Sequence, residues 1–170
     1  MCWTATSQHL TEAAAIRRSI AQYLEERVKE REALLDAEIV IGELLANAVR
    51  HSRGRFCADV EREGTRPVVV VHDAGRCFDG SAGPHHPFAE SGRGMDIVRA
   101  LAEDVRIRRV HPRGCIVSAK LKLTMRDDAR HEPTPCPRGE SRWELGCACA
   151  LEMHGLDPSH ASVAAPASVD

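Results

Sequence analysis

One helical stretch decides the fold and directs the search for a site: GELLANAVRHS, residues 42–52. Glu43, Asn47 and His51 are spaced four residues apart, so the three side chains share one side of a helix. Apolar residues fall on the neighbouring side of the same helix. A polar stripe beside a buried one predicts a helix that lines a pocket. The alternative is an ordinary solvated helix surface, where Glu and Asn are also common.

Working outward from this stretch, the apolar spacing predicts three helices. The first begins near Thr11 and carries apolar residues at helical spacing as far as Val28. The second covers residues 34–51, and the third begins near Gly94. The second helix should bury the stripe Leu35, Ile39, Leu44 and Ala48.

Segments with strand character alternate with these helices. Residues 56–60 alternate apolar and polar side chains, and residues 68–71 are an uninterrupted valine run. Residues 105–110 and 115–123 predict a closing hairpin. The order of elements predicts a two-layer α/β sandwich, in which a mixed, largely antiparallel sheet is covered on one face by helices.

The composition divides the chain into one domain and a tail. Residues 1–125 carry the periodic segments, and residues 126–170 contain five of the nine prolines and a low-complexity end. Such a segment buries too little apolar surface to offset its ordering entropy. We therefore expect residues 126–170 to be mostly disordered.

The overall charge and hydropathy exclude some classes of function. The 23 basic and 25 acidic residues give a net charge of −2, which leaves no basic field for nucleic acid phosphates. The N-terminus lacks the features of a signal peptide, and no apolar run approaches the ~18 residues that a membrane span needs. These features predict a cytoplasmic protein.

The cysteine pattern argues against a disulfide framework. The count is odd and the spacing irregular, with cysteines at Cys2, Cys57, Cys77, Cys115, Cys136, Cys147 and Cys149. We expect free thiols in a reducing cytosol. A zinc site formed by the C-terminal cysteines and His154 is the alternative, although the spacing typical of zinc sites is missing.

Two further segments have the character of a ligand site. The stretch VVVVHDAG, residues 68–75, places Asp73 at the end of a buried strand, where ligands often bind in α/β proteins. A plain turn is the alternative, because Asp and Gly are both favoured in turns. The stretch GRGMDIVRAL, residues 92–101, has two glycines before a helix start, which favours phosphate. It lacks the lysine of a P-loop and the third glycine of a dinucleotide motif.

Together these three stretches resemble the N, G1 and G2 boxes of the Bergerat-fold ATPases, the superfamily of gyrase, heat-shock chaperone, histidine kinase and mismatch-repair ATPase domains. More narrowly, they are similar to the small anti-sigma-factor serine kinases. The resemblance covers about Thr4 to Leu123. It implies the Bergerat fold and the cofactors ATP and Mg²⁺.

The resemblance also implies residue roles. Asn47 would ligate Mg²⁺ through its amide oxygen, and Glu43 would act as general base on the attacking hydroxyl. Asp73 would accept a hydrogen bond from the exocyclic amine of adenine, and Gly75 would let the base lie close. Residues 76–92 would form the ATP lid.

Phosphates would be held near the third helix, by Gly92, Arg93, Gly94 and the amide of Met95, with help from Arg50. The last box corresponds to the turn at Gly114. The family usually has threonine after this glycine, and the present chain has Cys115.

The function implied by the resemblance is that of a protein serine/threonine kinase. It would phosphorylate a serine on an anti-sigma-factor antagonist and sequester a sigma factor, with no direct role for nucleic acid or membrane and with a homodimer as one expected form. A non-catalytic ATP-binding module that only sequesters a partner is the main alternative. A detached histidine-kinase-like catalytic domain is a third, less favoured because no phosphoacceptor histidine helix is evident.

Overall fold

The computed structural model describes residues 2–6, 10–52, 54–73, 75, 77, 93–109 and 114–126. Within these residues the chain forms three helices, α1 (Leu10–Glu25), α2 (Leu34–His51) and α3 (Gly94–Leu101). It also forms five strands, β1 (Cys2–Thr6), β2 (Arg55–Glu63), β3 (Arg66–Asp73), β4 (Asp104–Arg109) and β5 (Cys115–Lys120).

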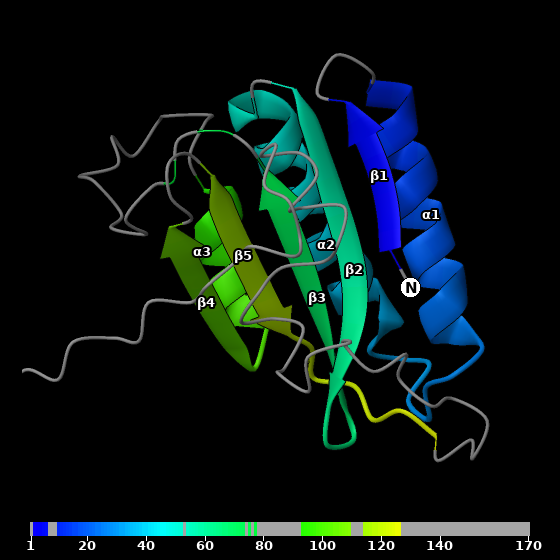
Figure 1. Cartoon of the computed structure of the whole chain (residues 1–170). Helices are drawn as coiled ribbons and strands as arrows, with labels where there is room; N and C mark the ends of the chain where they lie inside the picture. The colour runs from blue at the N-terminus through cyan, green and yellow to red at the C-terminus, as the bar shows by residue number, and fades with distance from the viewer. Residues whose placement is uncertain are drawn as a thin grey trace, which may run out of the picture.

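The five described strands form one sheet in the order β1-β2-β3-β5-β4, and each neighbouring pair is antiparallel. The helices lie side by side on one face of the sheet, with α2 between α1 and α3 (Figure 1). The structure thus confirms the two-layer sandwich with helices on one face. Strand β3 is central, since it pairs with β2 on one side and β5 on the other, and most of its valine run is buried.

Helix α2 packs on the sheet through a different stripe from the one that the sequence predicted. Leu44 and Ala48 are buried as expected, but Leu35 is 67% exposed and Ile39 is 38% exposed. The helix instead buries Ala37, Val40, Ile41, Leu44, Leu45 and Ala48. The predicted helical periodicity was correct, but the side of the helix that faces the sheet was predicted wrongly over the first two turns. Several apolar residues lie there on different sides of the helix.

Helix α1 ends at Glu25, so Val28 lies beyond the helix and not on its apolar stripe. Val28 is nevertheless fully buried, because it forms an isolated antiparallel bridge with Met125. The backbone N–H of Lys29 donates to the carbonyl of Thr124 at 2.9 Å. The chain that follows β5 therefore packs against the segment just after α1. The local sequence pattern did not indicate this contact.

Strand β1 was not expected from the sequence. Its five residues pair with β2 in a regular antiparallel register, in which Ala5 faces Phe56. Trp3 packs edge-to-face against Tyr23 of α1, with ring centroids 6.3 Å apart. This contact fixes the strand beside the first helix.

Parts of the predicted organisation fall on residues that the structure does not describe. These are most of the expected lid at 76–92, most of the expected turn between β4 and β5, and the expected tail beyond Arg126. The alternative zinc site of the C-terminal cysteines lies outside the described residues as well. No described helix combines the length and the hydrophobicity that crossing a bilayer requires.

Two isoleucines of α2 test the packing phase. Ile41 is fully buried and Ile39 is 38% exposed. Ile41→Ala should lower the free energy of unfolding by about 2–5 kcal/mol, because it leaves a cavity under the helix. Ile39→Ala should cost about 1 kcal/mol or less. Urea denaturation of both variants measures the difference, and equal losses would contradict the phase described above.

Candidate functional site

The C-terminal half of α2 forms one wall of a pocket at the ends of β3 and β5. The lining residues come from these three elements and are Leu44, Asn47, Ala48, His51, Val71, Asp73 and Val117. Asn47 is half-buried and His51 is exposed, while Leu44 and Ala48 continue into the core. The polar stripe of α2 therefore faces a pocket over part of its length, as the sequence predicted.

The end of α2 is fixed by Ser52. Its backbone N–H donates to the carbonyl of Ala48 at 2.8 Å, and its hydroxyl donates to the carbonyl of Arg55 at 3.2 Å. These bonds end the helix and turn the chain into β2. They hold the main chain of His51 in place beside the end of β3.

Asp73 is the last residue of β3 and is 7% exposed. Its Oδ1 accepts a hydrogen bond from the backbone N–H of Gly75 at 2.6 Å, which makes the chain turn directly after the strand. A Cβ added to Gly75 would collide with the carbonyl oxygen of His51 and with Asp73 Oδ1. Only glycine allows this close approach between the end of β3 and the end of α2.

Burial raises the pKa of the Asp73 carboxyl above its ordinary value of 3.8. The hydrogen bond from Gly75 and the nearby His51 act in the opposite direction but do not cancel the effect. A buried carboxylate that keeps its remaining lone pairs toward a pocket is well suited to accept a hydrogen bond from a ligand amine.

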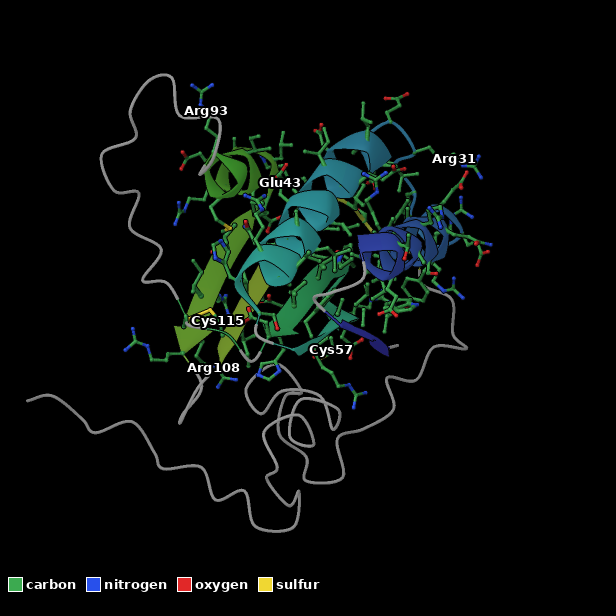
Figure 2. All side chains as sticks on the ribbon, turned by 90° about the horizontal axis from the view of Figure 1, so that it is seen from above. Arg31, Glu43, Cys57, Arg93, Arg108 and Cys115 are labelled. Atoms are coloured by element: carbon green, nitrogen blue, oxygen red, sulfur yellow. A yellow bond between two sulfur atoms is a disulfide. The ribbon has the colours of Figure 1, made fainter. Side chains whose placement is uncertain are left out.

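Glu43 lies one turn before Asn47 and faces the start of α3 (Figure 2). A Cβ added to Gly94, the first residue of α3, would overlap the carboxylate of Glu43. The missing side chain at Gly94 thus lets the carboxylate lie against the helix start. The structure brings Glu43 and the beginning of α3 together, although they are far apart in the sequence.

The beginning of α3 is the place where the resemblance predicts phosphate binding. Arg93 is the N-cap residue, is exposed, and makes no capping hydrogen bond with its side chain. The first backbone N–H groups of a helix lack intrahelical acceptors. Met95 is half-buried and packs against the core, which anchors this turn and leaves its amide near the helix start.

One predicted site residue, Arg50, does not join this group in the structure. Arg50 is exposed, and its Nε donates to the carbonyl of Ala46 at 3.3 Å, back along its own helix. Gly92 lies outside the described residues.

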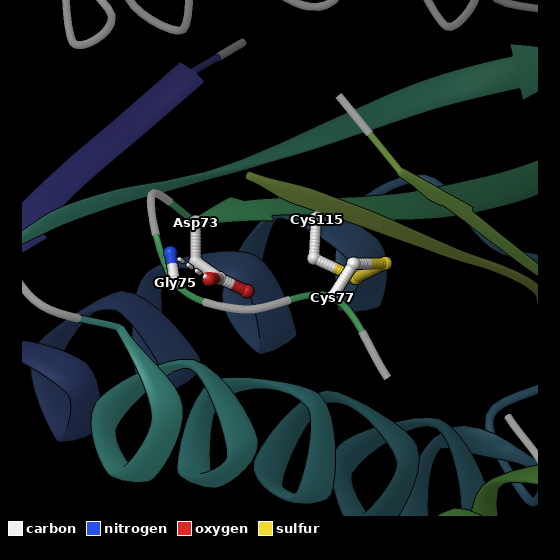
Figure 3. The surroundings of a disulfide bond; sticks show 4 residues. All are labelled: Asp73, Gly75, Cys77 and Cys115. Carbon is white, nitrogen blue, oxygen red and sulfur yellow. Dashed lines mark hydrogen bonds between the residues drawn. A yellow bond between two sulfur atoms is a disulfide. The ribbon is translucent and has the colours of Figure 1, made fainter. Parts of the chain in front are cut away.

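The expectation that all cysteines are free thiols is wrong for one pair. Cys77 and Cys115 form a disulfide, with their Cα atoms 4.5 Å apart (Figure 3). The register of β3 and β5 places Cys115 directly opposite Asp73, and the chain that leaves Asp73 brings Cys77 back to β5. The odd cysteine count gave no sign of this pair, because proximity depends on strand register. Cys57, on β2, is a buried thiol.

With this geometry in view, comparison with protein families gives one match. The model of the histidine kinase-like ATPase domain matches residues 6–121, more than half of the chain, and comparison with curated proteins gives no match. The fold and the family match define an ATP-binding α/β sandwich domain of the Bergerat type. The chain belongs to the histidine kinase-like ATPase domain family.

The glycine at position 75 can be tested against a matched control. Gly75→Ala should lower the free energy of unfolding by about 1–3 kcal/mol, because the added methyl group meets backbone that cannot easily move. Gly54→Ala should be neutral or slightly stabilising, since nothing lies within 4 Å of its added Cβ. Chemical denaturation of the two variants measures this contrast, and similar losses would rule out the proposed close packing.

Asp73→Asn should raise stability and weaken nucleotide binding. The pKa of Asp73 is higher in the fold than in the unfolded chain, so the free energy of unfolding falls as pH rises from about 3.8 through the raised pKa. Asparagine keeps the acceptor for Gly75 but removes this ionisation, so the melting temperature at pH 7 should rise. The gain should shrink as the pH is lowered toward 3.8.

The same variant presents an amide donor where an adenine amine needs an acceptor. Affinity for ATP should fall by about 10–100-fold, the equivalent of losing one charge-assisted hydrogen bond. The preference for ATP over GTP should fall with it. Calorimetric titration checks both effects. An unchanged preference for ATP over GTP would mean that Asp73 only shapes the turn and does not bind adenine.

Proposed function

We propose that this protein is an ATP-Mg²⁺-dependent serine/threonine kinase that phosphorylates a serine on an anti-sigma-factor antagonist and sequesters a sigma factor. Membership of the ATPase family supplies the ATP binding. The observation that carries the kinase step is the contact between the Glu43 carboxylate and the first residue of α3. It joins a candidate base to a candidate phosphate site.

Glu43 is placed to act on an acceptor hydroxyl. Its side chain is half-buried and lies against Gly94, so a γ-phosphate held by the start of α3 would be next to the carboxylate. A serine hydroxyl that approaches this phosphate would come within reach of the same carboxylate. Glu43 would then accept the hydroxyl proton as the oxygen attacks phosphorus.

Asn47 is the side chain best placed to hold Mg²⁺. It lies in the pocket wall, one turn beyond Glu43, and its amide oxygen is a ligand of the type that Mg²⁺ prefers. Magnesium usually takes few protein ligands in nucleotide sites and completes its shell with water and phosphate oxygens. A single Asn therefore fits. The bound ion would neutralise the phosphate charge during transfer.

The remaining wall of the pocket offers the chemical groups that a purine needs. Asp73 offers an acceptor at one end, and Val71 and Val117 offer apolar surface on the sheet side. Gly75 leaves the space beside Asp73 without a side chain. Adenine would lie between this surface and α2, with its phosphates directed toward Asn47 and α3.

The partners follow from the same proposal. The substrate is a protein that presents a serine, the second partner is a sigma factor, and both would meet the protein in the cytoplasm. The net charge of −2 agrees with protein partners and with no direct contact to nucleic acid or membrane. A homodimer is part of the proposal.

Glu43→Gln tests the kinase step. The amide keeps the size of the side chain against Gly94 but cannot accept a proton. Transfer of label from ATP to an anti-sigma-factor antagonist should fall by ~10²–10⁴-fold, the usual contribution of a general base. ATP binding should change little, because Glu43 is proposed to contact neither adenine nor metal. A phosphorylation time course and a calorimetric titration measure the two quantities.

Asn47→Ala is the control for the same experiment. It should abolish the Mg²⁺-dependent part of ATP binding and with it all transfer. If the wild type binds ATP but transfers no phosphate to any antagonist tested, the protein is instead a non-catalytic ATP-binding module that sequesters its partner. If Glu43→Gln transfers phosphate at the wild-type rate, the base is another residue.

A further inference from the structure

The disulfide between Cys77 and Cys115 lies at the edge of the nucleotide pocket. Cys115 and Asp73 are cross-strand partners on β5 and β3, and their side chains point toward the helix layer (Figure 3). Val117, which lines the pocket, is two residues further along β5 on the same face. The two sulfurs are therefore neighbours of the carboxylate proposed to bind adenine.

The bond also completes a set of restraints on the chain that leaves β3. Gly75 donates its N–H to Asp73 and packs against the carbonyl of His51, on the α2 side of the pocket. Two residues later Cys77 is bonded to Cys115, on the β5 side. In the disulfide form Gly75 and Cys77 are therefore held on opposite walls of the pocket.

This arrangement leaves Asp73 nearly inaccessible. The residue is 7% exposed, and one of its oxygens is already occupied by Gly75. The cavity that Asp73 lines has a volume of about 10 Å³, far smaller than a purine requires, so adenine can reach the carboxylate only if a wall of this cavity moves. The disulfide opposes movement of the wall next to Asp73, because it holds Cys77 on β5.

We propose that the Cys77–Cys115 pair is a redox switch for the nucleotide site: the disulfide form binds ATP weakly, and the dithiol form binds it tightly. The inference rests on adenine binding beside Asp73, which is part of the proposed function. Disulfides in a reducing compartment are usually transient and redox-sensing, which agrees with such a role.

The chemistry of the switch uses ordinary thiol–disulfide exchange. Cys77 is half-buried and Cys115 is 1% exposed, so the thiolate of a small-molecule or protein dithiol attacks the Cys77 sulfur. The S–S bond breaks, Cys115 leaves as a thiolate and takes up a proton, and Cys77 is held in a mixed disulfide. The second thiol of the reductant displaces Cys77 and becomes oxidised to a disulfide. Hydrogen peroxide reverses the change, taking two electrons from the two thiols and yielding water.

The test measures ATP affinity in both redox forms of the full chain. Serine replaces the cysteines that would otherwise compete for exchange, at Cys2, Cys136, Cys147 and Cys149. Thiol alkylation followed by mass spectrometry reports the state of the pair, and calorimetric titration with ATP-Mg²⁺ reports affinity. The reduced form should bind about tenfold more tightly, as expected if about a tenth of the oxidised molecules have the segment displaced.

Two variants separate the switch from a general effect of reductant. Cys77→Ser changes the half-buried partner, and Cys115→Ala changes the buried one without introducing a hydroxyl. Both should bind ATP like the reduced form, whether or not an oxidant is present.

Each remaining outcome has a definite meaning. Equal affinity in the two forms, tighter binding by the disulfide form, or failure of the pair to oxidise would overturn the switch and leave the proposed function standing. If neither form and neither variant binds ATP, the nucleotide site itself is wrong.

Discussion

The close approach of Gly75 to the main-chain carbonyl of His51 is the constraint on which the site depends. It joins the end of α2 to the end of β3, the two elements that supply Asn47 and Asp73. A side chain at position 75 would separate them. The apolar face of α2 could still pack on the sheet, but the walls of the pocket would lie farther apart and the turn after Asp73 would lose its hydrogen bond. The stability of the core and the shape of the site are thus linked through one backbone contact.

Much of this architecture could be predicted from the sequence because it depends on local patterns. The helical spacing around Asn47, the valine run of β3 and the glycine before α3 each predicted the correct element. The family resemblance then predicted that these elements would meet. The structure does place Glu43 against Gly94. The roles of these residues in binding and transfer remain predictions.

What the sequence could not predict depends on contacts between distant segments. Strand β1 is too short and too mixed in composition to be recognised alone. It is held by pairing with β2 and by the packing of Trp3 on Tyr23. Leu35 of α2 is apolar but exposed, since the phase of a helix on a sheet is set by all its neighbours. The disulfide has the same origin. Cys115 meets Cys77 only because the β3–β5 register puts it opposite Asp73.

The strand order has a consequence for the behaviour of the protein at high concentration. Strand β4 is one end of the described sheet, and its sequence, DVRIRR, carries three arginines. A second copy that tried to extend the sheet at this edge would bring like charges together, which disfavours edge-to-edge aggregation. The opposite end is β1, CWTAT, which carries no charge. Charge therefore opposes intermolecular strand addition at β4 but not at β1.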